Sequence, residues 1–160
     1  MKKKIMVFIL IALAVYFLVG GFVFNHVFKP SMPDFPKFFE KHKHFESAVE
    51  GVSLDIKKVE NDWAHCRVEM GAFAAGPPMH IHETFDEVFM VEYGTASIMV
   101  NGEKKTLTAG ESLLIPKGTP HKPFNETNEV VVLNDTTNQH ATMPASFVYG
   151  LAGIYSVMDE

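Results

Sequence analysis

The sequence predicts an all-β domain, built as an antiparallel sandwich or barrel and preceded by one transmembrane helix. Three observations support this prediction. The first is an uncharged apolar run over residues 5–24 of the 160-residue chain. The second is a series of short alternating runs after Phe45, each ended by turn residues. The third is that no long amphipathic helix pattern follows residue 50, so a single β domain is expected to bury the core.

The apolar run at residues 5–24 is long enough to cross a bilayer, because a helix of this length rises about 30 Å, the thickness of the hydrocarbon core. Lysines at positions 2–4 precede the run, and such a tail stays in the cytoplasm while the rest lies outside. We therefore expect an uncleaved signal-anchor at residues 1–28 and a single-pass membrane protein whose domain is extracytoplasmic. A signal peptide cleaved near Val19 or Gly21, which would give a secreted domain, is the alternative.

Charge and cysteine content exclude several classes of function. The net charge of the chain is −5, and the part after the N-terminal lysines carries −8, which makes nucleic acid a poor partner. The single cysteine, Cys66, cannot form an internal disulfide and lacks the paired spacing of a zinc knuckle or a dithiol redox site. A small-molecule substrate or ligand is the expected partner.

Residues 29–44 predict a semi-rigid linker, because three prolines among charged residues block regular helix and sheet. The three phenylalanines of this linker are expected to pack on the β domain, which covers residues 45–160. The Asn101-Gly102 pair favours a tight hairpin turn with two positive φ angles. The strands expected in the domain are 52–56, 64–70, 79–82, 87–93, 96–100, 105–107, 112–115 and 130–134.

Residue spacing points to a set of metal ligands. His80 and His82 are two apart on an expected strand, so both imidazoles project from the same face. Glu87 follows a polar turn, and His121 follows a turn rich in proline and glycine. Three neutral imidazoles and one carboxylate suit divalent Mn, Fe, Co, Ni, Cu or Zn, and they leave coordination positions open for water or substrate.

The strand that begins at Glu87 is expected to turn one face toward the interior. That face holds Glu87, Phe89, Val91 and Tyr93, so it is apolar apart from its first residue and the phenol of its last. A carboxylate at the start of such a row needs a cation or hydrogen-bond partners. This placement supports Glu87 as a ligand.

The two stretches that hold these residues resemble the two motifs of the cupin superfamily. The first, HIHETFDEVFMVEYG, carries His80, His82, Glu87 and Gly94, and it departs from the family pattern only at its leading glycine. That glycine is Gly76, four positions before His80, where the pattern has six. The second, GESLLIPKGTPHKPFN, matches every defining position of the pattern, namely Gly110, Pro116, Gly118, His121 and Asn125.

The resemblance implies a jelly-roll β-barrel in which His80, His82, Glu87 and His121 hold one divalent metal. It implies that the other motif positions form turns, and that two barrels form a homodimer, as small cupins generally do. It also implies a metal-dependent dioxygenase or isomerase acting on a small molecule. Glu87 is the candidate catalytic residue, since a carboxylate that is only weakly coordinated to the metal can also accept a proton. A non-catalytic barrel that binds a small molecule or a metal is the alternative.

Overall fold

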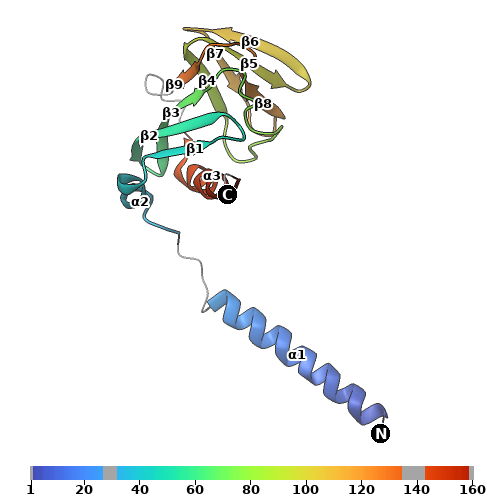
Figure 1. Ribbon diagram of the computed structural model, residues 1–160. Helices are drawn as coiled ribbons and strands as arrows, with labels where there is room; N and C mark the ends of the chain where they lie inside the picture. Colours follow the sequence, from blue (N-terminus) through green and yellow to red (C-terminus); the bar gives the residue numbers. More distant parts are fainter. Residues whose placement is uncertain (1, 27–31, 135–142, 159–160) are drawn as a thin grey trace. The chain divides into compact units, whose positions relative to one another are not determined.

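The computed structural model describes residues 2–26, 32–134 and 143–158 (Figure 1). They divide into two compact units, Met1–Pro33 and Asp34–Glu160, which are considered separately. The first unit holds helix α1 (Lys2–His26), and the second holds helices α2 (Phe35–Lys41) and α3 (Ala145–Met158). The strands of the second unit are β1 (His44–Ser47), β2 (Val52–Glu60), β3 (Trp63–Met70), β4 (Glu87–Tyr93), β5 (Thr95–Val100), β6 (Glu103–Thr108), β7 (Ser112–Ile115), β8 (His121–Phe124), β9 (Val131–Asn134) and β10 (Met143–Pro144).

Helix α1 does not meet the requirements of the predicted membrane anchor. Within the described residues, no helix has both the length and the apolar character needed to cross a membrane. The predictions of a transmembrane helix and of a single-pass membrane protein are contradicted by this finding.

Helix α2 lies in the stretch predicted to be an irregular linker. Asp34 caps the helix by accepting a hydrogen bond from a main-chain N–H of the first turn, and Pro36 lies in that turn, where a missing N–H costs nothing. The prediction that prolines exclude regular structure is therefore wrong here, because proline is tolerated at a helix start. Phe35 and Phe39 are buried, which confirms their expected packing on the domain. Residues 29–31 of the predicted linker, and residues 27 and 28 before it, lie outside the described residues.

The described strands form two antiparallel sheets that face each other as a sandwich. In the larger sheet the order is β1-β2-β3-β9-β4-β7, with β10 beside β3, and in the smaller sheet it is β6-β5-β8. Phe89, Val91, Ile98, Ile115 and Val131 are buried in the core between the sheets. The antiparallel β-sandwich of the predicted fold is thus confirmed.

Helices α2 and α3 cover the part of the large sheet that the small sheet leaves open. Leu54 and Ile56 of β2 and Cys66 of β3 pack against Phe39 of α2 and Val148 of α3. The expectation that no long helix follows residue 50 is wrong for α3. Two glycines and several β-branched or aromatic residues give this segment a weak helix propensity, so its helix depends on packing against the sheet.

Most predicted strands are present, with differences at particular positions. The hairpin turn between β5 and β6 is confirmed, since Asn101 and Gly102 have φ angles of 50° and 82°. The strand expected at residues 79–82 does not form, and His80 makes only an isolated bridge to the β8 strand. Tyr93 is 56% exposed rather than inward-facing, because the pairing of β4 with β9 shifts register after Val91.

Candidate metal centre

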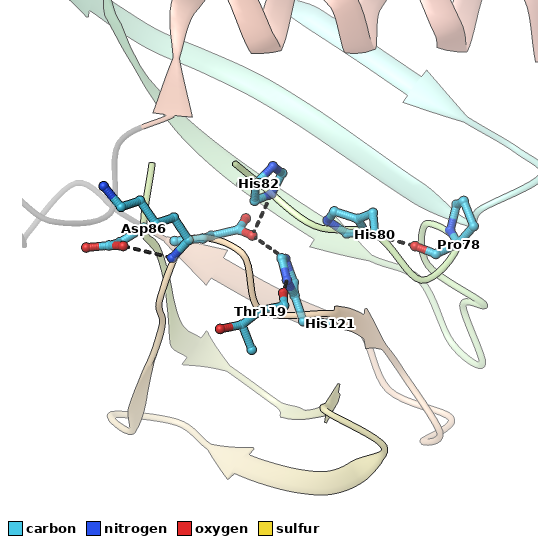
Figure 2. A network of polar contacts seen from close by, with 8 residues as sticks. Pro78, His80, His82, Asp86, Thr119 and His121 are labelled. Atoms are coloured by element: carbon cyan, nitrogen blue, oxygen red, sulfur yellow. Dashed lines mark hydrogen bonds and ion pairs between the residues drawn. The ribbon is translucent and has the colours of Figure 1, made fainter. Parts of the chain in front are cut away.

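The four predicted ligands lie together in the structure. His80 and His82 belong to the loop before β4, Glu87 is the first residue of β4, and His121 is the first residue of β8. One potential ligand atom from each side chain lies within 4.8 Å of those of the other three. His82 and His121 are buried, whereas His80 and Glu87 are partly buried. Figure 2 shows the labelled imidazoles turned toward a common point.

Main-chain hydrogen bonds hold the two motif loops against each other. The N–H of His80 donates to the carbonyl of His121 at 3.0 Å, and the N–H of His121 donates to the carbonyl of His80 at 2.9 Å. The N–H of Gly118 donates to the carbonyl of His82 at 2.7 Å, and that of Lys117 donates to the Asp86 carboxylate at 2.8 Å. The three histidines are therefore positioned by pairing between the loops, although residues 79–82 do not form a strand.

Gly76 also fixes the entry to the first motif loop. Its φ angle is +66°, a conformation that favours glycine, and its Cα packs against the main chain of Pro123 in β8, where a Cβ would clash. The leading glycine that departs from the family spacing thus still anchors the loop next to the strand that begins with His121.

Hydrogen bonds of the Nδ1 atoms of His80 and His121 leave the Nε2 atoms of both rings to face the cluster. The Nδ1 atom of His80 lies 2.8 Å from the carbonyl oxygen of Pro78, and that of His121 lies 2.8 Å from the carbonyl oxygen of Thr119 (Figure 2). A carbonyl oxygen only accepts, so both Nδ1 atoms donate. In the neutral rings the proton is therefore on Nδ1, and the lone pair of Nε2 is available for a metal.

The Glu87 carboxylate joins two of the imidazoles. Its Oε2 atom lies 2.8 Å from Nε2 of His121 and 3.1 Å from Nε2 of His82. Burial raises the pKa of Glu87, but the hydrogen bonds to His121 and His82 outweigh it and lower the pKa to about 2. Burial lowers the pKa of His121, but the hydrogen bond to Glu87 outweighs it and raises the pKa above its usual value. Burial lowers the pKa of His80.

Two aromatic side chains hold the ring of His82. Phe85 stacks on the imidazole with a centroid distance of 4.3 Å and an interplanar angle of 23°. Phe147 of α3 contacts it edge-on, at 4.7 Å and 83°. These contacts fix the plane of the ring and cover it from solvent. Phe147 could not be identified from the sequence, because its place beside His82 depends on the packing of α3.

A cavity of about 360 Å³ lies beside the cluster, between β2, β3, β4 and α3. His80, His82 and Glu87 line it, together with Val52, Leu54, Met70 and Phe89 from the sheet and Phe147, Leu151 and Tyr155 from α3. Glu50, in the turn before β2, also lines it. Spacing in the sequence did not indicate Glu50 or Tyr155, since neither belongs to a motif.

The donor set fits a divalent transition metal. Three imidazoles and one carboxylate are ligands that Mn, Fe, Co, Ni, Cu and Zn accept. Two ligand atoms on one ion at about 2.1 Å lie at most about 4.2 Å apart, so the observed cluster needs side-chain shifts of only about half an ångström. This His/Glu cluster could bind a metal.

Comparison with known proteins agrees with these features. Residues 65–137 match the family described as "Cupin domain", and this stretch contains both predicted motifs. One curated relative is "Oxidoreductase iacF" of the fungus Pestalotiopsis fici, 32% identical over 92 residues, which are 53% of this chain and 45% of the relative. The chain thus spans about half the length of this relative.

Several solved structures are also similar to this chain. KdgF from Halomonas sp. is 24% identical, with a TM-score of 0.47 and coverage of 56% of this chain and 81% of that one. A cupin-2 domain containing protein from Shewanella frigidimarina is 27% identical, with a TM-score of 0.45 and coverage of 65% and 93%. A predicted oxalate decarboxylase from Thermotoga maritima is 18% identical, with a TM-score of 0.49 and coverage of 56% and 84%.

Proposed function

We propose that this cupin-domain protein binds one divalent metal through His80, His82, Glu87 and His121 and acts on a small molecule as an oxygenase or isomerase. The contact between His121 and Glu87 is the main observation that supports the proposal. In neutral His121 the lone pair of Nε2 faces a carboxylate oxygen at 2.8 Å, and two acceptors at this distance repel unless a cation lies between them. A proton satisfies this contact in the metal-free protein, and a metal ion would replace it.

A bound metal would supply a Lewis acid that polarises an oxygen atom of the substrate. The chain itself supplies the surroundings of the reaction. The residues His80, His82 and Glu87 line the cavity, so a molecule bound there lies beside the cluster. The walls of the cavity are mostly apolar, and the rings of Phe85 and Phe147 keep His82 in place. The name of the curated fungal relative, an oxidoreductase, supports redox chemistry.

The properties of Glu87 favour a role as ligand over a role as proton acceptor. A carboxylate whose pKa is about 2 is a weak base, and its hydrogen bonds to two imidazoles already use its Oε2 atom. This observation also favours the second candidate function, in which the barrel binds a small molecule or a metal without catalysis.

Turnover assays separate these two candidates. The purified full chain is loaded in turn with each of the six metals, and oxygen uptake is measured with a panel of enols, catechols and flavonols. Isomerisation of the same compounds is followed by NMR. We expect turnover with at least one metal, loss of it in His82→Ala, and normal turnover in the matched variant His65→Ala on β3. Tight metal binding without turnover of any compound would instead support the non-catalytic barrel.

Metal binding is expected to weaken as the pH falls from about 7 to 5. The raised pKa of His121 means that a proton competes for its Nε2 atom at a higher pH than for an ordinary imidazole, whereas Glu87 stays ionised throughout this range. Below the His121 pKa, the apparent metal affinity should drop about tenfold per pH unit for each imidazole that must lose a proton. Metal analysis after dialysis at a series of pH values measures this. Unchanged metal content down to about pH 4 would indicate a ligand set richer in carboxylates.

A further inference from the structure

We infer that the substrate is an uncharged, mostly apolar molecule with a hydroxyl group, and that Glu50 accepts a hydrogen bond from this hydroxyl. The inference rests on the proposed function, because it names the substrate class of the same site. Glu50 lies outside the ligand cluster but lines the same cavity. It is only 5% exposed.

The lining of the cavity is mostly apolar, and its charged side chains are acidic. Apolar side chains from β2, β3, β4, β9 and α3 form most of the wall. Among the lining side chains, none belongs to a lysine or an arginine, and the acidic ones are Glu50 and Glu87. The remaining polar side chains of the wall are His80, His82, Tyr155 and the thiol of Cys66. The cavity therefore offers carboxylates and imidazoles but no fixed positive charge.

This lining disfavours an anionic substrate. A carboxylate that enters an apolar cavity loses its hydration, and here it would also approach the carboxyl groups of Glu50 and Glu87, with no lysine or arginine in the wall to balance it. For a hydroxyl group, in contrast, the free-energy cost of dehydration is largely offset when the hydroxyl donates a hydrogen bond to a carboxylate.

Glu50 is held in a fixed position relative to the cluster. Its N–H donates to Oγ of Ser47 at 3.3 Å, and its carbonyl oxygen accepts from the N–H of Gly76 at 2.9 Å. Gly76 in turn packs against the main chain of Pro123 in β8 and leads into the loop that carries His80. Gly76 thus joins Glu50 to the loop that carries His80. A substrate that contacts both Glu50 and this loop is oriented by rigid parts of the domain.

The cavity volume limits the size of the substrate. At the ~30 Å³ that one water molecule occupies in the liquid, about 360 Å³ holds on the order of a dozen non-hydrogen atoms. A single substituted ring with one hydroxyl group meets this limit. A long chain or a sugar chain exceeds it, and a sugar also needs more hydrogen-bond partners than the wall provides.

Two probes with the same apolar frame test the inference: 4-tert-butylbenzyl alcohol and its anionic counterpart 4-tert-butylbenzoate. Their binding to the full chain is measured by calorimetry at pH 8, after dialysis against a chelator and again after loading with Zn²⁺. We expect the alcohol to bind the metal-free protein at least about tenfold more tightly than the benzoate. Glu50→Gln should reduce this preference to less than about threefold, mainly by strengthening benzoate binding. The matched variant Glu60→Gln, on the exposed end of β2, should keep the wild-type preference.

The results that overturn the inference are distinct from a failure of the proposed function. Benzoate binding equal to or tighter than alcohol binding in the wild-type chain overturns it, and so does the failure of both probes to bind at 1 mM. An unchanged preference in folded Glu50→Gln overturns the role of Glu50. If this variant does not fold, the wild-type comparison still decides the substrate class. A chain that binds no metal refutes the proposed function, whereas the probe preference is measured without metal.

Discussion

His82→Ala lowers the affinity of the full chain for a divalent metal by at least about 100-fold, since even residues that only support a ligand contribute 10- to 100-fold. His82 is buried, its Nε2 atom lies 3.1 Å from Glu87, and Phe85 and Phe147 hold its ring. An alanine leaves three ligands and an apolar gap between the two phenylalanines. Competition titration against a chromophoric chelator measures the affinity, and circular dichroism verifies the fold.

The matched control for this variant is His65→Ala. His65 lies on β3, outside the ligand cluster, and its removal should leave the metal affinity within about threefold of wild type. The double variant His80→Ala/His82→Ala should bind no metal at the site. Wild-type metal content in this double variant would show that the metal binds elsewhere and would refute the assigned ligands.

Asn125→Ala reduces the free energy of unfolding by about 3 kcal/mol, because several buried polar groups lose their partner at once. Asn125 is 2% exposed, and its amide nitrogen donates to the carbonyl oxygens of Gly71 and Glu129, at 2.7 Å each. Its side-chain oxygen accepts from the N–H and the hydroxyl of Thr127, at 2.9 and 2.8 Å. The side chain therefore joins the end of β3 to the loop between β8 and β9.

Urea unfolding of the full chain measures this effect, and Asn128→Ala is the matched control. Asn128 is exposed in the same loop, so its removal should change the free energy of unfolding by less than about 0.5 kcal/mol. Equal stability of the Asn125→Ala and wild-type chains would contradict the structural role of the Asn125 side chain.

The four residues of the His/Glu cluster could be predicted from the sequence because their spacing is a local property. His80 and His82 lie two positions apart, and Glu87 and His121 fall at fixed intervals within two short motifs. The strand predicted at residues 79–82 is nevertheless absent. Pairing with the second motif loop, rather than a regular strand, places the two histidines, and such pairing between distant segments cannot be read from spacing.

Features that depend on distant packing could not be predicted. Helix α3 has weak intrinsic propensity, so neither the helix nor the contact of Phe147 with His82 has a signal in the sequence. Glu50 resembles any other surface acid until the chain folds and buries it in the cavity wall. The expected homodimer stays a prediction, and its test is light scattering of the full chain at high micromolar concentration.

Anomalous diffraction from crystals of the full chain, grown with Co²⁺ and measured on both sides of the metal absorption edge, tests the central claim most directly. We expect one anomalous peak per chain, about 2.0–2.2 Å from Nε2 of His80, His82 and His121 and bonded to the carboxylate of Glu87. A peak at other residues, or no peak between these four side chains, would contradict it.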